Sequence, residues 1–249
     1  MSTLLKSVLG AFVAIFATIS AFAANVAKIG DTEYATIDEA MEVVPDNGTV
    51  ELLTNVDLPN YFVYNGKNFT LDGKGFTLKC TKAHVSSNEK SAWRYFVNVN
   101  GGTQTYKNIT IDANNLVPYA IQSLNANSSI TLENVTIKNA KTTKDPFASK
   151  WWPSVALGYG IHVNNGGKVV ATNLKVSNCE VADVYVENSS TFTLAGDANN
   201  VDVLAVPITS TLLSSPASVN VEPFSTYTSA TVQSETFKFV AATLPPLFT

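Results

Sequence analysis

Apolar and polar residues alternate along several short stretches of the chain, and these stretches recur in a fixed order. Five copies of an alternating strand, a turn rich in Gly, Asn or Ser, and a second alternating strand lie between Tyr61 and Leu194: YFVYNGKNFTL, FVNVNGGTQTY, AIQSLNANSSITL, GIHVNNGGKVVA and DVYVENSSTFTL. In the first four copies a third strand follows, at residues 76–78, 109–111, 135–137 and 174–176. Since one such unit cannot bury its apolar side alone, stacked units are expected to share one apolar column.

The period of two predicts which side chains point into that column. The inward positions of the first strands are Phe62, Tyr64, Val97, Val99, Ile161, Val163, Val184 and Val186. Those of the second strands are Phe69, Leu71, Ile130, Leu132, Val169, Ala171, Phe192 and Leu194. Gln104 and Ser123 break the pattern, because they are polar residues at inward positions.

The spacing of the copies locates two insertions. The first strands, aligned on Phe62, Val97, Ile121, Ile161 and Val184, follow one another at steps of 35, 24, 40 and 23 residues. A basic unit therefore takes 23 or 24 residues, and the excess falls at the same corner both times, in residues 81–95 and 140–159. The insertions hold the three tryptophans and the single arginine, as Trp93, Arg94, Trp151 and Trp152, together with Lys150.

These insertions are expected to border the outer face of the first strands on one side. Outward positions there place Asn98, Gln122, His162 and Tyr185 in one row, with Asp183 and Glu187 beside Tyr185. Indole rings stack on the apolar face of a sugar, and amide or cationic groups take its hydroxyls and carboxylates. The predicted ligand-binding set is Trp93, Arg94, Lys150, Trp151, Trp152, Asn98, Gln122, His162 and Tyr185. The alternative is that the tryptophans fold back and seal the loops, and that His162 is a plain exposed strand residue.

Outward threonines and one asparagine position also repeat. Thr70, Thr105, Thr131 and Thr193 are expected outside the second strands, where Thr is favoured on any exposed strand and can also form ice-binding arrays. Asn108, Asn134 and Asn173 share one turn position, which predicts a ladder of side-chain amides. Asn108 and Asn134 lie in glycosylation sequons, and an amide engaged in a ladder is not free to carry a glycan.

The segments outside the repeat differ in character. Residues 1–23 combine Lys6, an uncharged run and the small residues Ala21-Phe22-Ala23, which predicts a secretory signal peptide; an uncleaved anchor is the alternative. Residues 24–58 are expected to form a cap of short strands and one helix, with Thr36 and Glu39 as its capping box and Pro45 at its end. Residues 59–205 contain the repeat, and residues 206–249 are further coils or a C-terminal cap and tail.

Charge argues against one class of partner, and the spacing of the cysteines argues against a disulfide. The 249-residue chain has a net charge of −4 and one arginine, which argues against a nucleic-acid partner.

Cys80 and Cys179 follow equivalent strands that are three units apart. At about 4.8 Å per unit the two cysteines would be separated by roughly 14 Å, which is beyond the reach of a disulfide. We therefore expect two free thiols; a disulfide made possible by loop excursions is the alternative.

Catalytic residues, metal ligands and cofactor motifs are not assigned. Glycosidases use two carboxyl groups about 5 to 9.5 Å apart, whereas Asp183 and Glu187 on one strand would lie about 13 Å apart. The acidic calcium cluster that a lyase would need is missing from the pattern. His162 or Lys150 would be the base if the chain were such an enzyme.

The segment KIGDTEYATIDEAMEVVPDNGTVELLTNVDL, followed by coils such as ITLENVTIKN, resembles the pectate-lyase-like superfamily of secreted and cell-surface microbial proteins. The resemblance implies an all-β fold, a right-handed parallel β-helix of about six coils with a short N-terminal helical cap. The predicted function is a secreted, non-catalytic, adhesion-like module that binds a polysaccharide or glycan surface, without cofactor or membrane span after signal cleavage. The alternatives are a small polysaccharide lyase or glycoside hydrolase acting on a pectin-like glycan, and a structural surface-layer or matrix protein without ligand.

Overall fold

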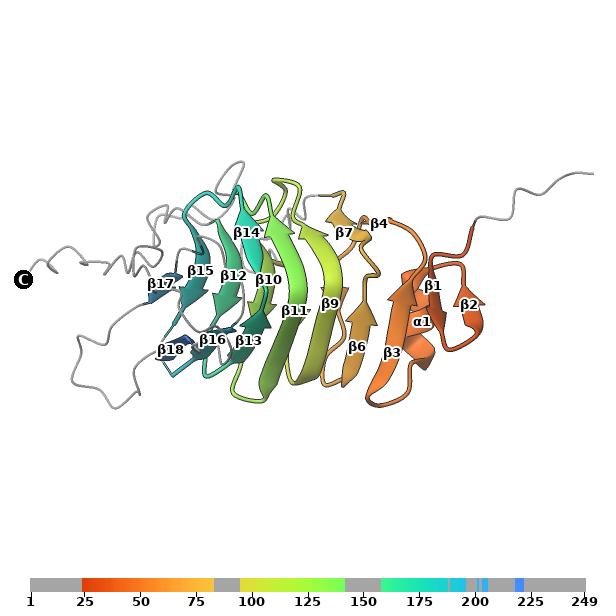
Figure 1. The fold of residues 1–249 in the computed structure, drawn as a ribbon, viewed down its shortest axis with the longest axis horizontal. Helices are drawn as coiled ribbons and strands as arrows, with labels where there is room; N and C mark the ends of the chain where they lie inside the picture. Colours follow the sequence, from red (N-terminus) through yellow and green to blue (C-terminus); the bar gives the residue numbers. More distant parts are fainter. Residues whose placement is uncertain are drawn as a thin grey trace, which may run out of the picture.

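The described residues form an almost entirely β structure with one short helix. The structure is a computed structural model that describes residues 24–82, 95–141, 158–187, 189–195, 201, 203–205 and 218–221. The strands lie side by side along the long axis of the molecule, from β2 and α1 at one end to β17 and β18 at the other (Figure 1). They belong to a 12-stranded and a 6-stranded sheet.

The 6-stranded sheet has the order β17-β15-β12-β10-β8-β5, and each neighbouring pair in it is parallel. Its strands are β5 (Phe62–Val63), β8 (Tyr95–Val99), β10 (Tyr119–Ser123), β12 (Tyr159–Val163), β15 (Ala182–Val186) and β17 (Val203–Ala205). All of them except β17 are the predicted first strands, and the structure pairs these in the predicted register: Phe62 with Val97, Val97 with Ile121, Ile121 with Ile161, and Ile161 with Val184.

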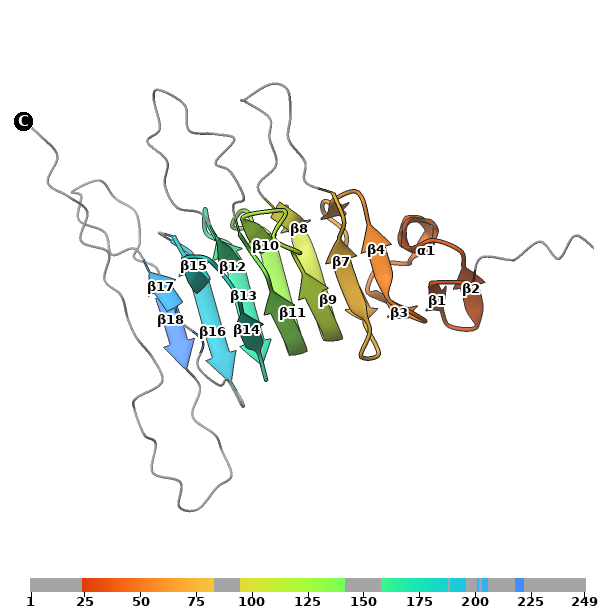
Figure 2. The same cartoon turned by 90° about the horizontal axis from the view of Figure 1, so that it is seen from above.

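The 12-stranded sheet contains the predicted second and third strands. Its members are β1 (Ala27–Ile29), β2 (Thr32–Tyr34), β3 (Gly48–Leu52), β4 (Val56–Leu58), β6 (Phe69–Asp72), β7 (Thr77–Cys80), β9 (Gly102–Asp112), β11 (Ser128–Lys138), β13 (Lys168–Thr172), β14 (Lys175–Ser177), β16 (Thr191–Ala195) and β18 (Ser218–Val221). All pairs are parallel except those of β1 with β2 and with β3. From β5 onward the chain passes repeatedly from one sheet to the other, and Figure 2 shows β8, β10, β12 and β15 as a layer beside β9, β11, β13 and β16.

The apolar core lies between the inner faces of the two sheets. All of the predicted inward residues are buried except Tyr64, which is half-buried and packs against the core. The two polar exceptions are buried with partners. Gln104 donates from Nε2 to the Tyr64 carbonyl at 2.9 Å and accepts from the Tyr106 hydroxyl at 2.6 Å, and Ser123 donates to the Ser128 carbonyl at 3.4 Å. Because its hydrogen-bonding groups have partners, an amide can be buried inside an apolar column.

The helix α1 (Ile37–Val43) begins and ends as predicted. Thr36 accepts a hydrogen bond from the Glu39 backbone N–H at 3.2 Å, and the Glu39 carboxylate accepts one from the Thr36 N–H, which completes the capping box. Its apolar side, Ile37, Ala40 and Met41, belongs to the same core as the strands. The helix thus packs against β1 and β2 at one end of the stacked strands (Figure 1).

The predicted asparagine ladder is present. Asn173 donates to Asn134 at 2.8 Å, Asn134 to Asn108 at 3.1 Å, and Asn108 to Asp72 at 3.2 Å. In two units the expected turn between the second and third strands is a bend within one long strand, because Asn108 and Asn134 take φ values of 49° and 54° inside β9 and β11. Asn and Asp tolerate this left-handed conformation better than most residues.

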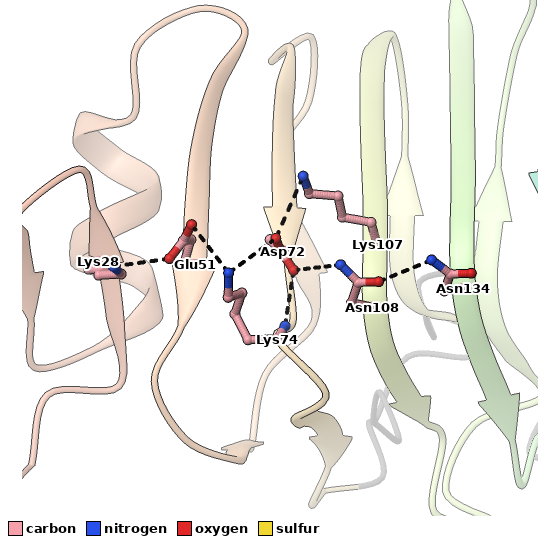
Figure 3. A network of polar contacts seen from close by, with 7 residues as sticks. All are labelled: Lys28, Glu51, Asp72, Lys74, Lys107, Asn108 and Asn134. Atoms are coloured by element: carbon pink, nitrogen blue, oxygen red, sulfur yellow. Dashed lines mark hydrogen bonds and ion pairs between the residues drawn. The ribbon is translucent and has the colours of Figure 1, made fainter.

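The ladder ends in a network of charges (Figure 3). The Asp72 carboxylate lies 3.6 Å from Lys107 Nζ and 3.9 Å from Lys74 Nζ, and it accepts a hydrogen bond from the Lys74 backbone N–H. Burial alone would raise the pKa of Asp72, but the hydrogen bonds from Lys74 and Asn108 and the two lysine charges together lower it. Lys74 Nζ also lies 3.7 Å from the Glu51 carboxylate of β3, so these contacts tie β3, β6, β9 and β11 together along one line.

Both cysteines are free, as predicted. Cys80 is buried and Cys179 is half-buried. No helix in the described part of the chain has the length and apolarity needed to cross a membrane.

Candidate functional site

The outer face of the 6-stranded sheet carries a cluster of aromatic side chains beside a row of polar ones. One row contains Tyr95, Tyr119 and Tyr159, which pair in register. The next row contains the predicted residues Asn98, Gln122, His162 and Tyr185, which also pair in register from β8 to β15. Together with Tyr61 and Glu187 at the two ends, these residues are called the tyrosine face below.

A local break in the strand alternation creates this face. Strict alternation would put Tyr95 on the same side as Val97, but the pairing of β8, β10 and β12 passes over Phe96, Ala120 and Gly160. Phe96 and Ala120 therefore join the core, while Tyr95, Tyr119 and Tyr159 form a separate cluster outside it. Sequence reasoning missed the three tyrosines. The signal that identifies them is a tyrosine three residues before each polar residue of the row: YFVN, YAIQ and YGIH.

Gly160 lies where β12 packs closely against its neighbours. A Cβ at this position would lie 2.6 Å from Val176 Cγ1 and 2.8 Å from the Asp183 carbonyl oxygen, so a side chain would not fit without displacing the backbone of β15. Close approach of this kind is a common reason for glycine within a strand.

The rings of the tyrosine face stack along the sheet. Tyr159 lies between Tyr119, with centroids 5.8 Å apart, and Tyr185, with centroids 4.6 Å apart, and both pairs are within about 21° of parallel. The His162 ring is stacked on Tyr185 at 5.2 Å and tilted against Tyr119 at 4.4 Å. At the other end, Tyr61 meets Tyr95 edge to face at 5.6 Å. Such contacts hold flat, rigid surfaces at low entropic cost.

Both ring nitrogens of His162 are engaged. Nδ1 lies 2.9 Å from Gln122 Nε2, and Nε2 lies 2.8 Å from the Glu187 carboxylate. If the Gln122 amide donates to Nδ1, the Nε2 hydrogen is directed at Glu187. In this arrangement neither nitrogen offers a free lone pair, as a general base must.

The polar row is buried rather than exposed, which corrects the expectation for His162. Asn98, Gln122 and His162 are 2%, 5% and 3% exposed. Tyrosine rings on both sides of the imidazole, together with Gln122 and Glu187, account for part of this burial. The two ends of the tyrosine face are more open: Tyr61 and Val63 at one end, and Tyr185 and Glu187 at the other, are half-buried.

Burial raises the pKa of three phenol groups of this face, Tyr95, Tyr159 and Tyr185, still further above neutral pH. It raises the pKa of Tyr95 to about 12. The pKa values of Tyr159 and Tyr185 are also raised, first by burial and then by the nearby Glu187 carboxylate. At neutral pH these hydroxyls are therefore uncharged groups that can both donate and accept hydrogen bonds.

Five residues of the predicted ligand-binding set lie outside the described residues: Trp93, Arg94, Lys150, Trp151 and Trp152. Their segments can be located in the chain relative to the described strands. Residues 83–94 connect β7 to β8 and end directly before Tyr95, and residues 142–157 end directly before Gly158 and Tyr159.

The predicted threonine row lies on the outer face of the other sheet. Thr70, Thr105 and Thr131 pair in register, and Thr49 extends the row, but Val170 interrupts it before Thr193. The next outward row is charged, with Glu51, Asp72, Lys107 and Glu133 in register. A single interrupted threonine row beside charges is an ordinary solvated strand surface.

Groups of three or more His, Cys, Asp and Glu placed to hold a metal ion do not occur within the described ranges. No protein-family model matches the chain, and comparisons with curated proteins and with solved structures find no match. The tyrosine face is therefore the candidate functional site.

Proposed function

We propose that the chain folds as a right-handed parallel β-helix of the pectate-lyase-like type, and that it acts as a secreted, non-catalytic carbohydrate-binding module. Two features support the fold proposal: the chain alternates between two sheets, and strands one repeat apart pair in parallel. A right-handed path follows from the general handedness of crossovers between parallel strands. Secretion is proposed on the signal-peptide pattern of residues 1–23.

The tyrosine face carries the proposed binding function. Stacked rings beside amide, imidazole and carboxylate groups combine flat apolar surface with hydrogen-bonding groups, as sugar recognition requires. The face extends from β5 to β15, which are four strand spacings apart, or about 19 Å at about 4.8 Å each. This length suits an extended oligosaccharide. Because both ends are half-buried and the centre is buried, a ligand is expected to meet Tyr61 or Tyr185 first.

Binding is a better account of these residues than catalysis. The candidate base His162 has both nitrogens engaged, and Glu187 is the one carboxylate of the tyrosine face, whereas glycosidases use a pair. The enzyme alternative predicts the release of reducing or unsaturated ends from a polysaccharide, and loss of that release in His162→Ala. The structural alternative predicts neither retention nor release.

The decisive experiment screens the secreted protein against a panel of polysaccharides, scoring both retention and product release. Tyr185→Ala is expected to weaken retention at least tenfold, since it removes a half-buried ring that a sugar can contact. Thr193→Ala, one strand further along the chain but on the outer face of the other sheet, is the matched control. Equal retention by both variants would contradict the proposed site.

The tryptophans form a separate part of this proposal that rests on the sequence alone. Trp151→Ala and Trp152→Ala should reduce retention with little change in the thermal midpoint if the rings contact glycan. A loss of stability of about 3 kcal/mol or more would instead show that these rings pack against the fold.

A further inference from the structure

Two buried amides in consecutive strands of the chain, Asn98 of β8 and Gln104 of β9, have different surroundings. Gln104, 1% exposed and on the inner side, has a hydrogen-bond partner for its carbonyl oxygen and for its amide nitrogen. Asn98, 2% exposed and on the tyrosine face, has a buried carbonyl oxygen with no hydrogen-bond partner among the described residues. A buried acceptor without a partner is unfavourable, and in native proteins such groups often serve a function.

The position of Asn98 points to a ligand. In the sheet it lies between Gln122 of β10 and Val63 of β5, and Val63 is half-buried. The acceptor is therefore one strand away from the more open end formed by Val63 and Tyr61. A sugar hydroxyl arriving at that end would supply the hydrogen that Asn98 Oδ1 lacks.

The charges of the face select among sugars. Its one carboxylate is Glu187, it contains no lysine or arginine, the phenols of Tyr95 and Tyr185 are neutral, and the buried Asn98 oxygen is an acceptor. A ligand carboxylate near Asn98 and Glu187 would meet an acceptor oxygen and a second carboxylate, without a lysine or arginine of the tyrosine face to balance its charge. Like charges and unpaired buried charges are strongly unfavourable.

We propose that the tyrosine face binds a neutral glycan rather than a polyuronate, and that Asn98 is a specificity-determining residue whose Oδ1 accepts a hydrogen bond from a sugar hydroxyl. This inference rests on the proposed carbohydrate-binding function and adds the substrate class to it.

The test compares Asn98→Leu with Gln104→Leu in the full secreted protein. Each variant removes a buried amide, but the amide oxygen has a protein hydrogen-bond partner only in Gln104. Asn98→Leu is expected to keep or raise the thermal midpoint and to weaken binding of a neutral oligosaccharide at least tenfold. Gln104→Leu is expected to lower the thermal midpoint while the folded protein binds as the wild type does. A lower midpoint for Asn98→Leu with unchanged binding would overturn the role given to Asn98.

Ligand probes keep the inference testable if either variant fails to fold. Wild-type protein is titrated with neutral gluco-, manno-, galacto- and xylo-oligosaccharides, and with oligogalacturonates of the same length. Tight binding of a neutral series, with at least tenfold weaker binding of one of its monodeoxy analogues, supports the inference. Binding of oligogalacturonates alone would overturn the neutral-glycan inference while leaving the proposed function intact. Binding of neither by any assay would overturn the proposed function itself.

Discussion

Two polar rows cross consecutive strands of this molecule, and they differ in how completely their hydrogen bonds are made. In the asparagine ladder, each of Asn173, Asn134 and Asn108 donates to the next member, and the series ends on Asp72, which is surrounded by donors. In the tyrosine face, Gln122, His162 and Glu187 are linked, but the row stops at Asn98, whose oxygen has no partner among the described residues.

The difference distinguishes a row that ties strands together from the row that we propose binds a ligand. A repeated amide at one position of each unit costs little when every member binds the next, so the ladder ties strands together. A row that leaves one buried acceptor open contributes less to stability, and it presents a group that a ligand can complete. Proteins commonly give up stability at binding sites in this way.

The largest expected loss of stability tests the alternation of inward and outward residues, on which both rows depend. Ile130→Asp places an unpaired charge in the apolar core, where Ile130 is fully buried, and should cost several kcal/mol and unfold the domain or block secretion. Thr131→Asp, at the next residue, points outward and should be tolerated. Secretion yield and circular dichroism measure both, and equal damage from the two variants would contradict the assigned faces.

A smaller effect is expected from breaking the ladder. Asn134→Ala removes one donated and one accepted hydrogen bond and places Ala at a φ of 54°. Together these changes should lower the free energy of unfolding by about 2 kcal/mol. Asn134→Gly keeps the backbone conformation accessible and isolates the hydrogen-bond part. Urea unfolding is the measurement; if Asn134→Ala proved as stable as the wild type, the ladder would not stabilise the fold.

Acid should weaken the ladder at Asp72. Because the folded pKa of Asp72 is lowered, its ionised form stabilises the fold above the unfolded value of about 3.8, and this contribution is lost as pH falls through the folded pKa. Thermal midpoints of wild type and Asp72→Asn should therefore differ at pH 7 and converge only as pH falls from about 3.8 through the lower, folded pKa. A constant difference over this range would show that the Asp72 charge is not the origin of the effect.

The sequence predicted the inner side of this fold better than its outer side. Inward residues such as Leu71 and Val169 follow from alternation, which is local, and the ladder follows from one repeated turn position. The tyrosine face depends on the break at Phe96, Ala120 and Gly160, which a strict period of two does not contain. The burial of Asn98 and His162 depends on neighbours from other strands, above all the tyrosines, so a pattern within one strand predicted exposure instead.

The smallest expected effect is on the rate at which each cysteine reacts with a thiol reagent. One cysteine lies in the sheet of the asparagine ladder and the other lies near the tyrosine face, so the two rates compare the two regions. Cys80 ends β7 of the 12-stranded sheet, and its carbonyl accepts a hydrogen bond from Asn114, whereas Cys179 packs beside Gly160 of β12. Burial raises the pKa of both thiols, that of Cys179 to about 11, so at pH 8 only about one Cys179 in a thousand is a thiolate.

Native protein should therefore react slowly with a thiol reagent, and the half-buried Cys179 should react before the buried Cys80. Denatured protein should take up two equivalents without prior reduction, because both cysteines are free. Mass spectrometry of the labelled peptides distinguishes the two sites. Faster labelling of Cys80 would mean that the strands beside the ladder open more readily than those beside the tyrosine face, which would reverse the stability difference inferred between the two rows.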